Sequence, residues 1–153
     1  MVHAVLEPPF EVLLVSNLAE LGRSIFGTID DADLAWRLTR LPDASVQVVT
    51  NDDRLVAFKL GYGVAMKRYR SWVGGVAPAF RRQGLARAML TRQHAWAAQR
   101  GYTMIETATD KDNTAMLSLN LAAGFEIVGS LTRETSPRVL LQKRLSRSPS
   151  MRP

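Results

Sequence analysis

A segment rich in glycine and arginine carries the clearest chemical signal in the chain. Gly74, Gly75 and Val76 end an apolar run, and a helix-forming stretch begins near Leu85. The loop between them reads Ala77-Pro78-Ala79-Phe80-Arg81-Arg82-Gln83-Gly84. The first turn of a helix has unpaired backbone N–H groups and a partial positive charge, and both attract anions. The segment therefore predicts a binding site for phosphate groups.

The side chains of this segment suit a diphosphate. Gly84 has no side chain and Ala86 has a small one, so a phosphate can approach the backbone closely. Arg81, Arg82 and Arg87 add positive charge around it. The same pattern also fits a loop whose arginines simply face the solvent. Neither GxxxxGK[ST] nor GxGxxG occurs, which argues against nucleotide hydrolysis and dinucleotide binding.

The elements that must position this segment follow from the apolar periodicity. We expect strands over residues 12–15, 46–49, 55–66, 71–76, 102–109, 125–131 and 139–145. We expect helices over residues 17–26, 31–41, 85–100 and 113–123. The order is thus β-α-α-β-β-β-α-β-α-β-β. The strand–helix–strand unit in the middle requires a right-handed parallel crossover, whereas the hairpins around it are antiparallel. The expected class is α/β, with helices on both faces of a mixed sheet.

Two motifs resemble those of a known family. Arg81-x-x-Gly84-x-Ala86 resembles the (Gln/Arg)-x-x-Gly-x-(Gly/Ala) motif of the GNAT superfamily of N-acetyltransferases, also between a strand and a long helix. Asn113-x-x-Met116, followed by Leu121-Ala122-Ala123-Gly124-Phe125, resembles the later helix of that family. The resemblance covers roughly residues 12–145. It implies a GNAT-like fold, with a mostly antiparallel mixed sheet and a central splayed pair of parallel strands.

The resemblance also implies an activity and a set of contacts. The expected reaction moves an acetyl group from acetyl-CoA, as cosubstrate, to a primary amine of a small molecule or peptide. The backbone of Gly74, Gly75 and Val76 is expected to follow the pantetheine arm and the acetyl carbonyl. The backbone N–H groups expected to hold the diphosphate belong to Arg82, Gln83, Gly84, Leu85, Ala86 and Arg87. Asn113 is expected both to contact the cosubstrate and to cap its helix.

The usual acid–base pair of the family is missing. Many members use a Glu to accept the amine proton and a Tyr to protonate the leaving thiolate. The matching positions here are Ala108 and Asn120, and neither side chain can perform this proton chemistry.

Three explanations remain for this departure. Asn120 occupies the Tyr position, as in some branches of the family, and thiolate release relies on solvent or another donor. Alternatively, a relocated group supplies the proton path, with Glu106 first because it alternates with Ala108 on one strand face. The other relocated candidates are Asp110, Tyr62, Tyr69 and His94. In the third explanation, the domain binds acyl-CoA without catalysis.

The composition limits the remaining function classes. The chain has 153 residues, 46% hydrophobic and 22% charged, which is typical of one soluble globular domain. With no cysteine and only two histidines, no metal site is expected. The net charge of +6 and the pI near 10.3 keep nucleic-acid binding as a third, less favoured hypothesis. Part of this charge lies in a tail over residues 146–153, which we expect to be disordered beyond a single domain over residues 1–145.

The same composition gives expectations for location and assembly. No apolar run approaches the roughly 20 residues that span a bilayer, and the N-terminus does not resemble a signal peptide. We therefore expect a cytoplasmic protein with neither a membrane nor nucleic acid as its partner. A homodimer is expected only by analogy with the fold.

Overall fold

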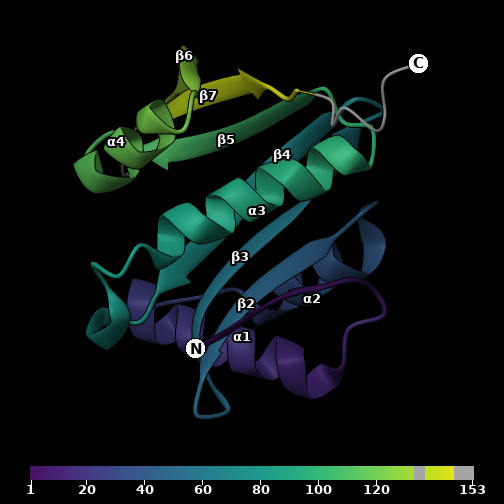
Figure 1. The fold of residues 1–153 in the computed structure, drawn as a ribbon, viewed down its shortest axis with the longest axis vertical. Coiled ribbons are helices and arrows are strands. Elements are labelled where there is room, and N and C mark those ends of the chain that lie inside the picture. Colours follow the sequence, from purple (N-terminus) through teal and green to yellow (C-terminus); the bar gives the residue numbers. More distant parts are fainter. Residues whose placement is uncertain (133–136, 147–153) are drawn as a thin grey trace.

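The computed structural model describes residues 1–132 and 137–146 (Figure 1). Its elements, in order, are β1 (Val2–Leu6), α1 (Val12–Phe26), α2 (Asp31–Arg40), β2 (Ser45–Asn51), β3 (Arg54–Ala65), β4 (Arg68–Val76), a 3₁₀ turn (Pro78–Phe80), α3 (Leu85–Gln99), β5 (Met104–Asp110), α4 (Thr114–Ala122), β6 (Glu126–Leu131) and β7 (Arg138–Arg144). This is the predicted order of strands and helices. The tail predicted to be disordered lies outside the described residues, except for Ser146.

The first strand was predicted in the wrong place. Residues 12–15 form the start of α1, and the strand is instead Val2–Leu6, which pairs antiparallel with β2. Val12 and Leu13 are exposed, whereas Leu18 and Ala19 in the next turn are buried. Residues 14 and 15 are partly buried, so burial recurs with helical spacing. A short apolar run does not by itself distinguish a strand from the start of an amphipathic helix.

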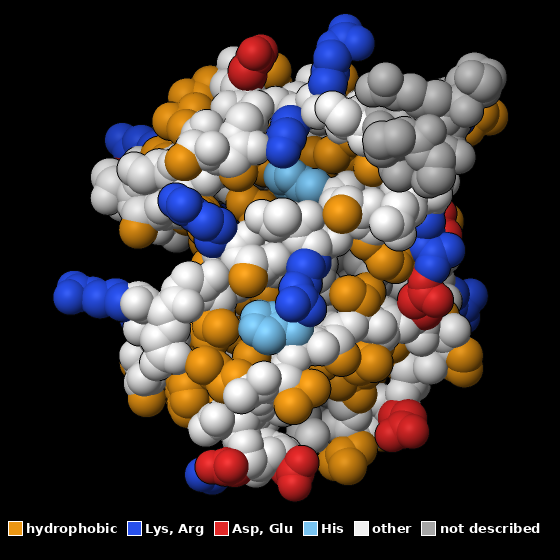
Figure 2. Space-filling model, in the orientation of Figure 1, with side chains coloured by type: hydrophobic (Ala, Val, Ile, Leu, Met, Phe, Trp, Pro, Cys, Tyr) orange, Lys and Arg blue, Asp and Glu red, His pale blue; other side chains and the backbone are white. Residues whose placement is uncertain are grey.

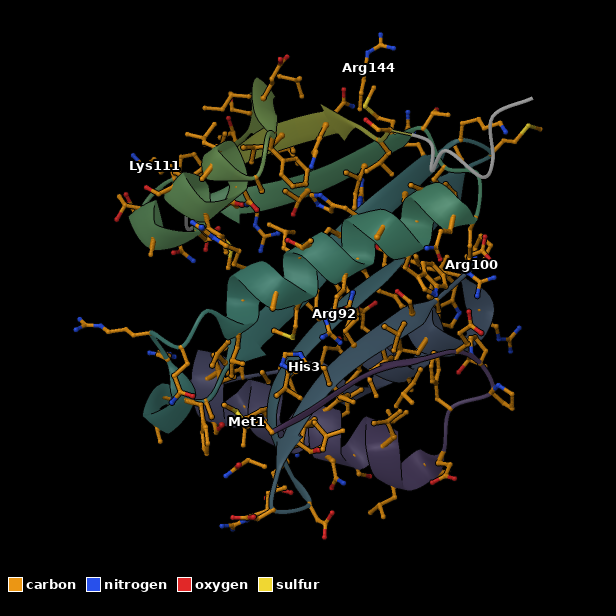
Figure 3. All side chains as sticks on the ribbon, in the orientation of Figure 1. Met1, His3, Arg92, Arg100, Lys111 and Arg144 are labelled. Atoms are coloured by element: carbon orange, nitrogen blue, oxygen red, sulfur yellow. The ribbon has the colours of Figure 1, made fainter. Side chains whose placement is uncertain are left out.

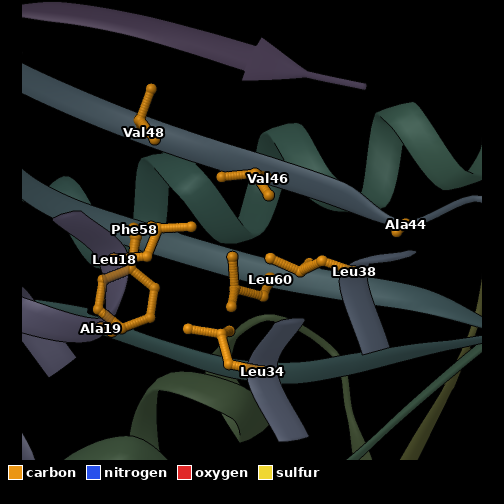
Figure 4. Packing of buried hydrophobic residues seen from close by; sticks show 9 residues of the cluster. All are labelled: Leu18, Ala19, Leu34, Leu38, Ala44, Val46, Val48, Phe58 and Leu60. Carbon is orange, nitrogen blue, oxygen red and sulfur yellow. The ribbon is translucent and has the colours of Figure 1, made fainter. Parts of the chain in front are cut away.

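The seven strands form one mixed sheet in the order β1-β2-β3-β4-β5-β7-β6. Helix α3 lies across one face of the central strands, and α1 and α2 lie on the opposite face (Figure 1). Figure 4 shows the apolar core beneath α1 and α2. Its buried members are Leu18, Ala19, Leu34, Leu38, Ala44, Val46, Val48, Phe58 and Leu60. A separate core under α3 joins Leu90 and Ala97 to Ile105 and Leu141 of β5 and β7.

Strands β4 and β5 form the parallel pair, and their pairing is short. It covers Arg68↔Met104, Tyr69↔Ile105 and Arg70↔Glu106. Beyond these positions β4 continues to Val76 beside β3, while β5 continues to Asp110 beside β7. In the described residues, the side of β4 that faces β5 therefore has no strand partner from Ser71 to Val76. This confirms the predicted splayed parallel pair.

We searched the described residues for membrane-spanning helices and for metal sites. No helix among them is long and apolar enough to cross a membrane. No group of three or more His, Asp or Glu side chains among them is arranged to hold a metal ion. On the face shown in Figure 2, Lys and Arg side chains are scattered among apolar and neutral atoms, without a continuous basic stripe.

Candidate active site

A cavity of about 420 Å³ opens where β4 and β5 diverge. On β4 it is lined by Gly74, Gly75 and Val76, as predicted from the sequence. Its other lining residues come from α1, β3, the loop before α3, α3 itself, and α4 with its cap: Ile25, Phe26, Phe58, Lys59, Arg81, Ala86, Met89, Asn113, Ala115, Met116 and Leu119. The cavity is therefore walled by elements from both faces of the sheet.

A second cavity, of about 560 Å³, adjoins the first at the start of α3. The two share the residues Val76, Arg81, Ala86, Ala115 and Leu119. The second is further lined by Phe80, Arg82, Gly84, Leu85 and Arg87. We call the two cavities together the splay cleft. Of the predicted cosubstrate-binding residues, Gln83 alone lines neither cavity.

The backbone at the start of α3 is free to bind an anion. Gly84 caps the helix in a left-handed conformation (φ 76°) and provides no side chain to accept from the first N–H groups. The first turn also contains no acidic residue. Arg82, with φ 63°, is left-handed as well, and Nε of Arg81 donates to the carbonyl of Val76 at 3.2 Å. These contacts shape a basic loop whose helix-end donors lack a capping side chain.

The two glycines of β4 make room for protein groups on both faces of the sheet. A Cβ atom on Gly74 would lie 2.7 Å from Cδ of Lys59 and 2.9 Å from the carbonyl oxygen of Phe58. A Cβ atom on Gly75 would lie 2.8 Å from Cδ1 of Ile25. Either residue would therefore clash if it carried a side chain. Packing alone therefore explains why both positions are glycine. That the glycines also let a thioester approach the backbone remains a prediction.

Asn113 caps α4 and lies beside the cleft. Its side-chain oxygen accepts a hydrogen bond from the backbone N–H of Met116 at 3.2 Å, so it caps α4. It also lines the first cavity, beside Gly74 and Gly75. The predicted capping role is confirmed, and direct contact with a cosubstrate remains a prediction.

Asn120, the first predicted catalytic residue, does not line the splay cleft. Its side chain is buried, with 2% of its surface exposed, and its Nδ2 donates to Oγ1 of Thr109 at 3.1 Å. This hydrogen bond ties α4 to β5. In the structure, Asn120 therefore helps to hold α4 against β5, and its side chain does not reach the cleft.

Glu106, the second predicted catalytic residue, lies at the base of the splay. It occupies the last paired position of β5, beside Arg70 of β4. Its carboxylate forms ion pairs with Nε of Arg68 at 2.7 Å and with a guanidinium nitrogen of Arg70 at 3.0 Å. Both bonds use lone pairs that a proton acceptor would need. Glu106 is not among the residues that line the cleft.

The relocated tyrosine and aspartate candidates have partners of their own. Tyr62 is buried and accepts a hydrogen bond from Arg37. Tyr69 is fully buried, its hydroxyl lies 2.7 Å from that of Ser45, and burial raises its pKa well above the usual range. Asp110 pairs with Arg138 at 3.2 Å. The two tyrosines thus pack in the interior of the fold, and the aspartate forms an ion pair at its surface.

His94 is a buried neutral histidine on the inner face of α3. Burial, followed by the nearby charges of Lys143 and Lys59, lowers its pKa to about 3. Its Nδ1 lies 3.0 Å from Nζ of Lys143, and because an ammonium group only donates, Nδ1 accepts and Nε2 carries the proton. The other histidine, His3 on β1, lies near Arg92 of α3 (Figure 3). Neither histidine lines the cleft.

Lys59 is a charged cleft residue that the sequence analysis did not predict for the site. It lies on β3 opposite Gly74, its stem passes over that glycine, and no described acidic side chain forms an ion pair with it. Burial lowers its pKa to about 8. The sequence does hold a signal, because Lys59 is a lone charge within the apolar strand segment Val56-Ala57-Phe58-Lys59-Leu60. A buried charge is costly unless it is paired, so an unpaired charge at such a position points to a functional role.

Comparison with solved structures identifies the same architecture elsewhere. The ribosomal-protein-S18-alanine N-acetyltransferase from Escherichia coli superposes with a TM-score of 0.83 at 15% identity, covering 99% of each chain. A GNAT family acetyltransferase from Elizabethkingia anophelis, solved with acetyl-CoA bound, has a TM-score of 0.73 at 14% identity, covering 94% of this chain and 97% of that one.

A third structure, PaiA N-acetyltransferase from Thermoplasma acidophilum in complex with coenzyme A, has a TM-score of 0.73 at 11% identity. That alignment covers 94% of this chain and 99% of the other. At these identities the likeness is one of fold. No curated protein sequence matches the chain.

The sequence itself matches a family model. The model of the acetyltransferase (GNAT) family matches residues 13–125, which include the β4–β5 splay, the loop before α3 and the cap of α4. The match thus spans most of the chain and most of the cleft. On this ground the chain belongs to the GNAT acetyltransferase family.

Proposed function

We propose that this protein is an acetyl-CoA-dependent N-acetyltransferase, which acetylates a primary amine of a small molecule or peptide. The observation that carries the proposal is the short β4–β5 pairing, which leaves the edge of β4 open along a cleft that ends at an uncapped helix N-terminus. A long thioester with a diphosphate near one end fits both features at once.

Different parts of the cleft bind different parts of the cosubstrate. The N–H groups at the start of α3, with Arg81, Arg82 and Arg87 nearby, hold the diphosphate. The free N–H and C=O groups of β4 bond the amides of the pantetheine arm, as an added strand would. Asn113 closes the cleft from α4.

The acetyl group then lies at the Gly74 end of the cleft, near α1. Ile25 and Phe26 form the wall there, and Phe26 is about half exposed. We place the acceptor amine on this side, because Phe26 both lines the cavity and is exposed to solvent. When bound, acetyl-CoA supplies an activated acyl group, and the chain contributes positioning and backbone donors near the carbonyl oxygen.

A non-catalytic acyl-CoA-binding module is the second candidate. Ala108 occupies the position where relatives carry a Glu, and Asn120 is buried away from the cleft. Binding needs neither residue, so the cleft alone is compatible with such a module.

Turnover separates the two candidates. The purified protein is incubated with acetyl-CoA and a panel of primary amines and peptides, and free thiol is measured against time. Release that depends on both the amine and the protein supports the transferase. Saturable binding of acetyl-CoA by calorimetry, without amine-dependent release across the panel, supports the module. Loss of binding in Gly84→Glu shows that either result comes from the splay cleft.

A further inference from the structure

The first cavity of the splay cleft, which Gly74 and Gly75 line, contains very few groups able to move a proton. Of its lining residues, only Lys59 and Arg81 have ionisable side chains. Arg81 bonds to the carbonyl of Val76 on the diphosphate side, and a guanidinium does not release its proton in proteins. Lys59 is therefore the one lining side chain of this cavity that is able to act as an acid.

We propose that the ammonium group of Lys59 protonates the leaving thiolate during acetyl transfer. This proposal rests on the proposed function. It assigns to a residue of β3 the protonation of the thiolate, for which many family members use a tyrosine on a helix. Lys59 is opposite Gly74 in the β3–β4 ladder, and its Cδ lies where a side chain at position 74 would begin. The stem thus crosses β4 toward the gap at the acetyl end of the cleft.

The surroundings of Lys59 favour an acid that gives up its proton readily. His94 faces it from α3 and is neutral, and Lys143 of β7 lies behind that imidazole. On β2, directly opposite Lys59 in the register, the side-chain nitrogen of Gln47 is buried without a hydrogen-bond partner. Burial without a carboxylate partner brings the pKa of Lys59 to about 8, close to the value of about 8.5 for an ordinary thiol. Proton transfer between two groups of similar pKa is efficient near neutral pH.

The step balances as follows. The amine lone pair forms the new C–N bond, the C–S bond breaks, and its electron pair leaves on sulfur. Lys59 gives one proton to that sulfur and becomes a neutral amine. The nitrogen of the new amide loses one proton to water, and Lys59 regains one from water. The net products are the acetylated amine and coenzyme A as its thiol.

The first test needs no turnover. Coenzyme A is bound to the wild-type protein and to Lys59→Met, and the ultraviolet absorbance of the thiolate is followed against pH. A cation beside the sulfur lowers the thiol pKa, so the wild type should hold roughly threefold more thiolate than Lys59→Met at pH 8. Equal thiolate in both proteins would overturn the proposal. Lys67→Met, at an exposed turn lysine, is the matched control and should behave as wild type.

The second test measures the reaction. Lys59→Met should lower kcat by about 100-fold, with little change in the Kd of acetyl-CoA. At saturating amine the wild-type kcat should fall above about pH 8, as the ammonium form is lost, and Lys59→Met should lose this limb. With the acetyl selenoester analogue the defect should shrink, because a selenolate leaves without needing a proton.

The outcomes separate this proposal from the proposed function. Amine-dependent turnover with an unchanged kcat in Lys59→Met removes the role of Lys59 and leaves the transferase. Binding of coenzyme A without turnover in the wild type removes both the transferase and its acid. Mass spectrometry that finds Lys59 itself acetylated after incubation with acetyl-CoA overturns the proposal as well, because an amide cannot supply the proton.

Discussion

The two ends of the splay cleft are built in different ways. The diphosphate end is made by one continuous stretch, in which a loop with two left-handed residues leads into α3. The acetyl end is assembled from α1, β3, β4 and α4, which are far apart in the sequence. The first end depends on backbone groups and permanent charges, and the second on side chains and on one titratable amine. Under the proposed function, binding and chemistry are thus separated along the cleft.

The largest effect should come from breaking the diphosphate end. Gly84→Glu puts bulk and negative charge where the phosphates bind, and should weaken acetyl-CoA binding by at least about 100-fold in calorimetry. Gly101→Glu is the matched control, because Gly101 also has a positive φ with open space for a Cβ, but follows the other end of α3. Equal affinity in Gly84→Glu and wild type would contradict the assigned loop.

The buried side of α3, which lies next to the acetyl end, should lose stability in acid. His94 has a pKa of about 3 when folded and an ordinary value near 6.5 when unfolded, so the unfolded chain binds its proton first as the pH falls. Its contribution to stability is complete above pH 6.5 and is lost toward pH 3. Between pH 7 and pH 5 the free energy of unfolding should drop by about 2 kcal/mol from this group.

Urea titrations at these two pH values measure that drop. His94→Gln should flatten the pH dependence, since an amide of similar shape does not titrate. An equal drop in the variant and the wild type would place the acid sensitivity in other groups.

Asn120→Ala tests whether the acetyl end extends beyond the lining residues of α4 to Asn120. The change removes the hydrogen bond to Thr109 and leaves a buried hydroxyl unpaired, which should cost roughly 1 to 2 kcal/mol of stability in thermal or urea unfolding. Because the side chain is away from the cleft, kcat should change by less than about threefold. A large loss of turnover at unchanged stability would restore the catalytic role first predicted from the sequence.

Glu106→Gln should have the smallest effect. Arg68 and Arg70 are each about half exposed, so losing their ion pairs should cost less than about 1 kcal/mol. Turnover should stay within a few-fold of wild type. A 100-fold fall in kcat, together with loss of the acidic limb of its pH profile, would instead identify Glu106 as the base that accepts the amine proton.

The sequence predicted most of what is local. The loop from Arg81 to Ala86, the cap at Asn113 and the strands around them follow from short-range rules of helix ends and apolar alternation. The first strand was misplaced because residues 12–15 are apolar without a clear period. Lys59 was missed because its place in the cleft depends on two tertiary features. Gly74 lies opposite it in the sheet register, and α3 packs over it. Neither feature can be derived from spacing along the chain. The roles first considered for Asn120 and Glu106 depend likewise on side-chain partners that spacing does not show.

The open edge of β4 also sets how its amide hydrogens should exchange with solvent. Along a strand, backbone donors point alternately to the two sides, so from Val73 to Val76, beyond the irregularity at Trp72, every second N–H is bonded toward β3 and the others face the gap. Deuterium should therefore enter this segment of the free protein with a two-residue rhythm. A ligand that lies along the gap would slow the fast sites only, so the length over which the rhythm disappears would record how far the bound molecule extends.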